Sequence, residues 1–242
     1  MKTAFITGSS RGIGRAIAKR LACDGFNVII HGVTESEKLK ELKREIEEEG
    51  GAAEIAAANL CDLTETMKLA EAVSNVDVLV LNASVQYRTP WQEITLGACY
   101  DQLNCNFVSS LALIQMAVQH MKDAGCGRII TVGSVQEAKP HPDMLVYSAS
   151  KAAQTNMVRS LSLQLAKDGI TVNNVAPGVI YTDRNVEALS DPDYAKKVTN
   201  SIPVGFYGEP EDCAGIVSLL CSEEGRYITG QSIYVDGGKS VQ

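Results

Sequence analysis

The sequence lacks the features that mark several classes of protein. Its 242 residues carry a formal net charge of −7 and contain no basic stripe, which argues against a nucleic-acid partner. No apolar run approaches the length that spans a bilayer, and a strand-like segment begins almost at Met1, so we expect neither a membrane anchor nor a secretory leader. No tandem repeat, low-complexity tract or linker interrupts the chain. These absences favour a single cytoplasmic domain that spans residues 1–242.

Clusters of metal ligands are lacking as well. The three histidines lie far apart in the sequence, and the seven cysteines form an odd set without a Cys-x-x-Cys pair. Such cysteines are typical of reduced thiols in a cytosolic protein, and we expect most of them to be buried. The sequence therefore predicts no metal site.

The chain does contain an unbroken alternation of strand-like and helix-like segments. Repeated βα units joined by short turns imply an α/β fold, with a parallel, doubly wound sheet and helices on both faces. One connection, residues 179–208, is long and polar, and we expect it to cover a substrate. The expected strands are residues 2–6, 26–31, 52–58, 76–81, 128–132, 170–175 and 232–235, and the expected helices are residues 15–22, 35–49, 63–73, about 95–124, 146–167 and 210–221.

A glycine-rich turn, residues 7–14 (TGSSRGIG), joins the first strand to a helix that carries apolar Ile17 and Leu21 four positions apart. A strand, a glycine turn and a helix in this order are typical of a dinucleotide site. The glycines allow the backbone to turn tightly beside a pyrophosphate, and the helix N-terminus supplies unpaired N–H groups. An ordinary βα turn is the alternative.

A second motif is the pair Tyr147 and Lys151, four residues apart on an expected helix. Side chains at this spacing project from the same helix face, so the ammonium lies beside the phenol and favours its ionised form. A tyrosine whose pKa is lowered in this way can exchange a proton with a substrate oxygen. Tyr-x-x-x-Lys also arises by chance, and a surface pair without function is the alternative.

Further motifs accompany these two. Ser134 lies thirteen positions before Tyr147, and Asn106 lies in the long expected helix. Residues 177–182 (PGVIYT) follow the sixth strand, and residues 228–238 contain ITGQ and VDGG. With these motifs the chain resembles the classical short-chain dehydrogenase/reductase family over essentially its whole length, and it is similar to the 3-oxoacyl-(acyl-carrier-protein) reductases of that family. The resemblance implies a Rossmann-like seven-stranded sheet of order 3-2-1-4-5-6-7 and NAD(P)-dependent chemistry on alcohols and carbonyls.

The resemblance also implies roles for four side chains. Tyr147 is expected to act as general acid in carbonyl reduction and as general base in alcohol oxidation. Lys151 is expected to lower the pKa of Tyr147 and to hydrogen-bond the nicotinamide ribose. Ser134 is expected to hold the substrate oxygen, and Asn106 to order a water path from Lys151 to solvent. The alternatives are a strand-end cap for Ser134 and a helix-packing amide for Asn106.

The same resemblance implies that NADP(H) is the preferred cofactor and that NAD(H) is possible. Gly32 stands at the end of the second strand, where an acidic residue that selects NAD would fall. Arg11 resembles the basic residue that NADP-preferring members place on the 2′-phosphate, and Thr34 could donate a hydrogen bond, although Val33 stands where an arginine would favour NADP further. The expected cofactor-binding residues are Gly8, Ser10, Arg11, Gly12, Ile13, Gly14, Thr34, Asn59, Leu60, Asn82, Ala83, Tyr147, Lys151, Pro177, Gly178, Ile180 and Thr182.

Two positions depart from the family pattern. Ser84 replaces the glycine that usually follows Asn82 and Ala83, which makes the local backbone less permissive. Asn59 stands where many members carry an aspartate that accepts a hydrogen bond from adenine, and we expect its amide oxygen to do the same.

The expected substrate is a small molecule with a carbonyl or a secondary alcohol. Residues 135–142 and 86–91 should line a pocket polar enough for a small hydroxylated or acidic molecule. A 3-oxoacyl-thioester reductase and a sugar or polyol dehydrogenase, NADP- or NAD-dependent, both fit. Cofactor-free lyase chemistry, as in halohydrin dehalogenases, is disfavoured by Lys151 and the glycine turn, and a non-catalytic dinucleotide-sensing protein by the complete catalytic set. The resemblance further implies a homotetramer.

Overall fold

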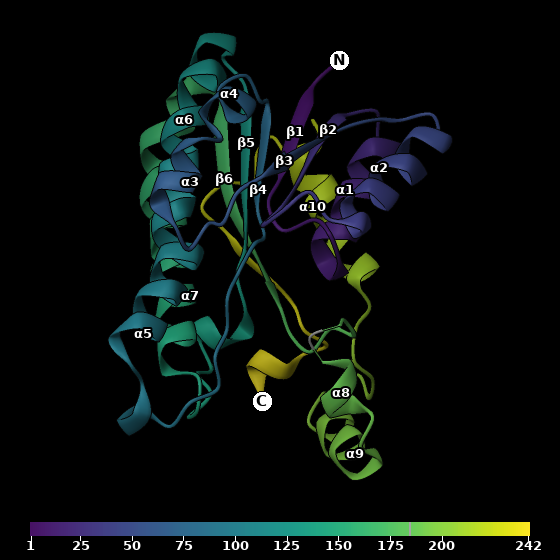
Figure 1. Ribbon diagram of the computed structural model, residues 1–242, viewed down its shortest axis with the longest axis vertical. Coiled ribbons are helices and arrows are strands. Elements are labelled where there is room, and N and C mark those ends of the chain that lie inside the picture. The colour runs from purple at the N-terminus through teal and green to yellow at the C-terminus, as the bar shows by residue number, and fades with distance from the viewer. Residues whose placement is uncertain (184) are drawn as a thin grey trace.

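The computed structural model describes residues 1–183 and 185–242, and its centre is a seven-stranded parallel sheet (Figure 1). The strands are β1 (Thr3–Ile6), β2 (Asn27–Gly32), β3 (Ala52–Ala57), β4 (Val78–Leu81), β5 (Gly127–Val132), β6 (Ile170–Pro177) and β7 (Ser232–Val235). Their order is β3-β2-β1-β4-β5-β6-β7, so the predicted topology is confirmed. In this register, Phe5 of β1 pairs with Ile29 of β2 on one side and with Leu79 of β4 on the other.

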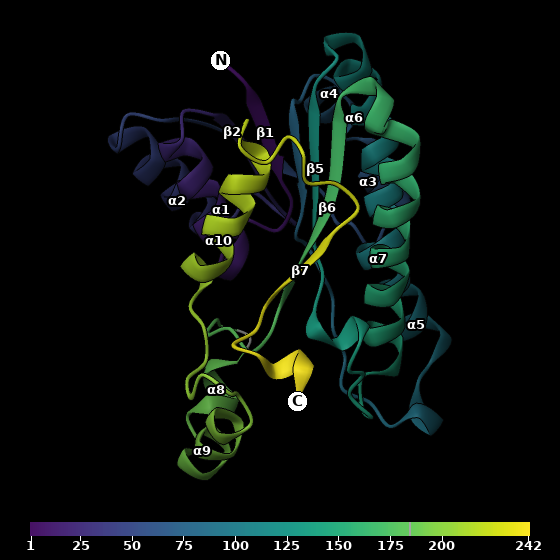
Figure 2. The same cartoon turned by 180° about the vertical axis from the view of Figure 1, so that it is seen from behind.

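Helices cover both faces of the sheet (Figures 1 and 2). One face carries α1 (Gly12–Cys23), α2 (Glu37–Glu48) and α10 (Pro210–Cys221). The other carries α3 (Leu63–Met67), α4 (Ala70–Val73), α5 (Leu96–Leu103), α6 (Ser109–Ala124) and α7 (Leu145–Leu165). Beyond the carboxyl ends of the strands lie α8 (Val186–Leu189) and α9 (Pro192–Asn200). Short turns complete the chain: η1 (Trp91–Glu93), the π-helical η2 (Asn104–Val108), η3 (Val135–Glu137), η4 (Ala166–Asp168) and η5 (Lys239–Val241).

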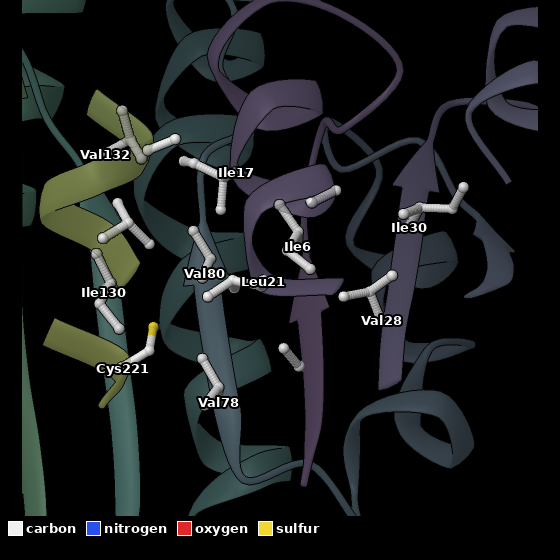
Figure 3. Packing of buried hydrophobic residues seen from close by; sticks show 14 of the residues in the cluster. Ile6, Ile17, Leu21, Val28, Ile30, Val78, Val80, Ile130, Val132 and Cys221 are labelled. Atoms are coloured by element: carbon white, nitrogen blue, oxygen red, sulfur yellow. The ribbon is translucent and has the colours of Figure 1, made fainter. Parts of the chain in front are cut away.

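Two apolar layers hold the helices on the sheet. Ile6 of β1 packs with Ile17 and Leu21 of α1 in the first layer (Figure 3). Phe5, its neighbour in the strand, belongs to the second layer together with Leu113 of α6, because successive side chains of a strand point to opposite faces. Strands that are covered on both sides have almost continuously apolar sequences, which made them visible in the amino-acid sequence.

Two helices differ from their predicted form. The helix expected over residues 63–73 is divided into α3 and α4, because the N–H groups of Lys68 and Leu69 donate to carbonyls three residues back and tighten the helix there. The long helix expected over about 95–124 is interrupted by the π turn η2, which contains Asn106. Such turns are frequent at functional sites.

All seven cysteines are free thiols, but the expectation that most are buried is wrong. Only Cys105, Cys213 and Cys221 are buried, and burial raises the pKa of each of these thiols. Cys61, Cys99 and Cys126 are half-buried, and Cys23, the last residue of α1, is exposed. In the part of the chain that the structure describes, no three His, Cys, Asp or Glu side chains form a metal-binding group. None of the helices described combines the length and apolar character needed to cross a bilayer.

Candidate active site

A cavity of about 1120 Å³ opens at the carboxyl ends of the strands. The loops that follow β1 to β6 line it, together with α9 and η5. In Figure 1 this region lies at the lower end of the sheet, between the α8 and α9 pair and the lower ends of α5 and α7. The strand order reverses between β1 and β4, and open α/β sheets bind ligands at such a switch point.

The glycine turn after β1 is held by the loops beside it. Gly8 N–H donates to His31 Nδ1 at 3.1 Å, and Thr7 Oγ1 accepts the N–H groups of Asn82 and Ala83 at 2.9 Å each. Asn82 Nδ2 donates back to the carbonyls of Thr7 and Gly8 at 2.9 and 3.0 Å. Gly8 has a φ of +64°, and a Cβ at this position would lie 2.9 Å from Ala83 Cα. The close approach of the two loops therefore requires glycine.

The turn leaves the N-terminus of α1 open to the cavity. Arg11 is the N-cap residue, and its side chain makes no capping hydrogen bond. Ser10, Gly12 and Ile13 line the cavity beside it. Unpaired N–H groups and the positive end of the dipole of this twelve-residue helix favour an anionic group here. The residues present therefore fit the pyrophosphate of a dinucleotide.

The predicted cofactor-binding residues lie around this cavity with two exceptions. Thr34 is exposed and lies outside the lining, whereas Val33, its neighbour in the bend after β2, lines the cavity. Lys151 lies behind the wall. Asn59 lines the cavity, but its Oδ1 accepts the N–H of Cys61 at 3.1 Å within its own loop.

Ser134 and Tyr147 face the cavity from two adjoining elements. Ser134 follows β5 and caps η3, where its Oγ accepts the Gln136 N–H at 3.2 Å. Ser134 thus makes the capping interaction that the sequence analysis gave as an alternative, and it also lines the cavity. Tyr147 lies in the first turn of α7 and is only 5% exposed, so neighbouring groups fix its ring.

Lys151 lies one helical turn after Tyr147, with its Nζ 5.7 Å from the centroid of the Tyr147 ring. The side chain is 1% exposed, and Nζ donates to Val132 O at 2.7 Å and to Gln154 Oε1 at 3.2 Å. A buried ammonium needs such acceptors. Sequence reasoning missed Gln154; its only signal was a polar residue three positions after Lys151 on the same helix face.

Asn106 is buried behind the cavity wall. Its Oδ1 accepts the Val85 N–H at 2.8 Å, and its Nδ2 donates to Val85 O and to Ser150 Oγ at 2.9 Å each. Ser150 Oγ donates in turn to Tyr147 O at 2.7 Å. These bonds join the loop after β4 to the turn of α7 that carries Tyr147. The water path expected from Asn106 to Lys151 stays a prediction.

His31, which sequence reasoning also missed, lies at the cofactor side of the cavity. Its ring is 2% exposed, its Nε2 faces Ala58 O at 3.1 Å, and its Nδ1 accepts the Gly8 N–H. These partners assign the neutral tautomer with the proton on Nε2. Burial lowers the pKa of His31 to about 4, against the opposing effect of the Ala58 carbonyl. The available signal was a polar residue at the end of an otherwise apolar strand.

The two segments predicted to form the substrate pocket contribute unequally. Gln86 and Arg88 line the cavity, whereas Tyr87 and Trp91 do not. Glu137 also lies outside the lining and accepts hydrogen bonds from side chains of α7, β6 and β7. Lys239 of η5, which the sequence did not suggest, lines the cavity.

The arrangement places two hydroxyl groups and an anion-binding helix end on one cavity. The hydroxyls of Ser134 and Tyr147 can hydrogen-bond one substrate oxygen and exchange a proton with it. The open N-terminus of α1 can hold a phosphate group of a second molecule.

Comparisons with known proteins match nearly the whole chain. A family model described as enoyl-(acyl carrier protein) reductase matches residues 8–240. A 3-oxoacyl-(acyl-carrier-protein) reductase from Rickettsia bellii is 38% identical over 238 residues, covering 98% of this chain and 96% of the relative. The 3beta-hydroxysteroid dehydrogenase 1 of Eggerthella lenta is 34% identical over 245 residues, covering 99% and 94%. The crystal structure of a 3-oxoacyl (acyl-carrier-protein) reductase from Agrobacterium tumefaciens C58 with NADP bound has a TM-score of 0.93 and 34% sequence identity, covering 98% of this chain and 93% of that chain.

Proposed function

The chain belongs to the classical short-chain dehydrogenase/reductase family, and from this premise we propose that it interconverts a ketone and a secondary alcohol with NADP(H). One observation carries the proposal: Ser134, Tyr147 and the glycine turn line a single cavity, and the Lys151 ammonium lies 5.7 Å from the Tyr147 ring. The similar proteins are named as dehydrogenases or reductases, and this chain keeps the residue types that such chemistry uses.

In this proposal the residues of the chain hold the substrate oxygen and move one proton. The Ser134 hydroxyl donates to the substrate oxygen and orients the carbonyl carbon. In reduction, Tyr147 Oη gives its proton to that oxygen as the carbon gains a hydride; in oxidation, the Tyr147 phenolate takes the proton of the alcohol. The Lys151 ammonium favours the phenolate by its charge. When bound, the nicotinamide supplies or accepts the hydride.

The preference for NADP(H) is supported by the residues at the end of β2. Gly32 and Val33, which stand where an acidic residue would accept a ribose 2′-hydroxyl, line the cavity at the end of β2. Arg11 lines it as well and can pair with a 2′-phosphate. The similar structure from Agrobacterium tumefaciens holds NADP. A higher kcat/KM with NADH than with NADPH would contradict this part of the proposal.

Two substrate classes fit the cavity. The relative from Rickettsia bellii is named for reduction of a 3-oxoacyl group, and a thioester of this kind is one candidate. The polar side chains of Gln86, Gln136 and Ser201 in the lining favour a small hydroxylated molecule such as a sugar or polyol, with NADP or NAD. A dinucleotide-sensing protein without turnover is the third candidate.

The direct test is Tyr147→Phe, with Tyr227→Phe as the matched control because Tyr227 is 98% exposed. NADPH binding is followed by fluorescence titration, and turnover by NADPH absorbance with acetoacetyl-N-acetylcysteamine, oxo sugars and polyols. Tyr147→Phe should bind NADPH as the wild type does and lose at least about 99% of turnover, since an essential proton donor is removed. Wild-type rates in Tyr147→Phe would overturn the acid/base assignment, and NADPH binding without turnover in the wild type would favour the sensor.

We extend the proposal to organisation and assembly. That residues 1–242 form one domain is supported by one sheet whose strands run from Thr3 to Val235. A homotetramer is supported by apolar side chains left exposed on two long helical segments, Tyr100 of α5 at 59% and Leu163 of α7 at 82%. Sedimentation equilibrium would contradict the tetramer if it gave the mass of a single chain.

A further inference from the structure

The wall of the cavity is basic although the chain is acidic. The net charge of the protein is −7. Among the described residues that line the cavity, the only acidic side chain is Asp183, and it is paired with Lys38 at 2.8 Å. The lining side chains therefore carry a net positive charge, opposite in sign to that of the whole protein, which favours anionic ligands. The basic side chains in the lining are Arg11, Arg88, Lys139 and Lys239.

This positive charge divides between the two ends of the cavity. Arg11 lies at the N-terminus of α1, where the proposed function places the dinucleotide. The other three lie on the loops after β4 and β5 and on η5, which continue the wall past Ser134 and Tyr147. We name Arg88, Lys139 and Lys239 the basic rim.

Hydrogen bonds tie the segments of the basic rim together. Thr89 N–H donates to Asp143 O at 2.9 Å and joins the Arg88 loop to the loop after η3. Lys139 Nζ, on that second loop, donates to Lys239 O at 3.2 Å. Figure 1 shows the C-terminal turn between the α8 and α9 pair and the lower end of α7. The segments that carry the three cations, far apart in the sequence, are thus joined to one another in the cavity wall.

No cation of the basic rim is in an ion pair with an Asp or Glu side chain among the described residues. The Arg88 guanidinium makes no hydrogen bond or ion pair within the part of the chain that the structure describes. Lys139 Nζ donates to Lys239 O at 3.2 Å and to an oxygen of Gln242, the last residue, at 2.8 Å. Lys239 Nζ donates to Ser201 Oγ at 2.6 Å. Elsewhere on the surface, lysines such as Lys19 are paired with glutamates.

The pKa of Lys239 reflects its burial and the nearby positive charge of Lys139. Burial lowers the pKa of Lys239, and the nearby charge of Lys139 lowers it further. Asp236 opposes the effect, but its carboxylate already accepts two backbone N–H groups of the following turn, at 2.9 and 2.6 Å. An anion in the cavity would relieve the repulsion between the two ammonium groups.

We propose that the basic rim binds an anionic group of the substrate, a carboxylate or a phosphate monoester. The inference rests on the proposed function, because Ser134 and Tyr147 must take the oxygen that reacts while the rim holds the other end. The planar fork of Arg88 suits bidentate binding of either group, and Lys239 adds a point charge. The chain then prefers hydroxy acids, oxo acids or sugar phosphates to neutral alcohols and ketones.

The experiment compares alcohols that differ mainly in charge, with NADP⁺ in excess. The pairs are D-gluconate with D-gluconamide, 3-hydroxybutyrate with its amide, and D-glucitol 6-phosphate with D-glucitol. The anionic member of the best pair should have a kcat/KM at least about tenfold higher, the effect of one well-placed charge pair. The first two pairs identify a carboxylate and the third a phosphate. Equal rates, or faster turnover of every neutral member, would overturn the proposal.

Variants locate the effect. Arg88→Gln and Lys239→Gln should each lower the ratio of anionic to neutral kcat/KM, mainly through KM, by about tenfold. Arg44→Gln is the matched control, because Arg44 lies on α2, is exposed and is absent from the cavity lining. A ratio unchanged in both rim variants would overturn the assignment of the rim.

A second readout separates this inference from the proposed function. Glutarate has no hydroxyl or ketone to react, and its uncharged counterpart is glutaramide. Glutarate should raise the Tm of the NADP-bound protein, glutaramide should not, and Arg88→Gln should abolish the difference. Absence of turnover with every alcohol would overturn the proposed function while glutarate still tests the rim. Turnover without any response to glutarate, and without preference for anionic substrates, would overturn the rim alone.

Discussion

The N–H of Gly8 donates to Nδ1 of His31 at 3.1 Å, and this bond joins the glycine turn to the end of β2. The other ring nitrogen of His31 faces Ala58 O at 3.1 Å, at the end of β3. The imidazole therefore spans the three loops that form the cofactor side of the cavity. Because Nδ1 must be unprotonated to accept, the geometry of the glycine turn depends on a neutral histidine.

Acidification should therefore destabilise the protein through His31. The pKa is lowered from 6.5 to about 4 by burial, so the unfolded chain binds more protons than the folded chain between these two values. The stabilising contribution is complete above about pH 6.5 and is lost as the pH falls toward about 4, a change on the order of 3 kcal/mol. Urea denaturation between pH 7 and pH 4.5 measures it.

His31→Gln separates this contribution from that of other groups. The amide stays neutral and offers an oxygen to the Gly8 N–H, so the free energy of unfolding should fall less steeply with acidification than in the wild type. His141→Gln is the control and should keep the wild-type slope, since the Nδ1 of His141 accepts the Asp143 N–H in its own loop and not the N–H of the glycine turn. The same slope in His31→Gln and in the wild type would refute the role of the imidazole.

Gly14→Ala should damage the glycine turn. A Cβ at Gly14 would overlap Asn82 Nδ2 and Gly8 O, which are already hydrogen-bonded to each other. We expect the free energy of unfolding to fall by about 1–3 kcal/mol from overpacking, and NADPH affinity to fall by at least about tenfold as the turn shifts. Denaturation and fluorescence titration measure the two effects.

Gly215→Ala is the matched control for this substitution. Gly215 lies within α10, and no atom comes within 4 Å of a Cβ built there. Because glycine is a poor helix former, alanine should raise the stability by about 0.5–1 kcal/mol and leave NADPH binding unchanged. If Gly14→Ala behaved like Gly215→Ala, the close packing of the turn against Asn82 would be wrong.

Much of the fold was predictable because each strand and most helices carry a local signal. The four residues of β4 are all buried and apolar, so its sequence reads as a continuous apolar run, whereas the six buried residues of β5 include Arg128 and Thr131. The division between α3 and α4 and the π turn η2 were not predictable. No glycine or proline marks either one, and both depend on how backbone hydrogen bonds settle in the folded chain.

The candidate site divides in the same way. The glycine turn and the spacing of Tyr147 and Lys151 are short-range features that a helix or a βα turn fixes in space. His31 and Lys239 gain their surroundings from segments far away in the sequence, such as the glycine turn and the loop of Lys139. The spacing of apolar residues along the chain gives no information about contacts between such distant segments. The sequence does not indicate which of the adjacent residues Val33 and Thr34 lines the cavity. Thr34 was therefore expected beside a cofactor, whereas Val33 is the one in the lining.

Asn106→Leu should destabilise the protein as well as impair turnover. The substitution removes the acceptor of the Val85 N–H and the donor to Val85 O and Ser150 Oγ, in a position that is fully buried. Leucine fills a similar volume, so the main cost is buried polar groups without partners. We expect a loss of about 2–4 kcal/mol in the free energy of unfolding, measured by urea denaturation.

Asn104→Leu, two positions earlier in the same π turn, is the matched control. Its side chain makes one hydrogen bond, from Nδ2 to Cys61 O at 3.2 Å, and is only half-buried. The loss of stability should therefore be about 1 kcal/mol. A large drop in turnover by Asn106→Leu with unchanged stability would mean that the amide acts through water and Lys151 instead of holding the loop after β4. If turnover and the free energy of unfolding both fell, Asn106 would be identified as the residue that positions Tyr147 through Ser150.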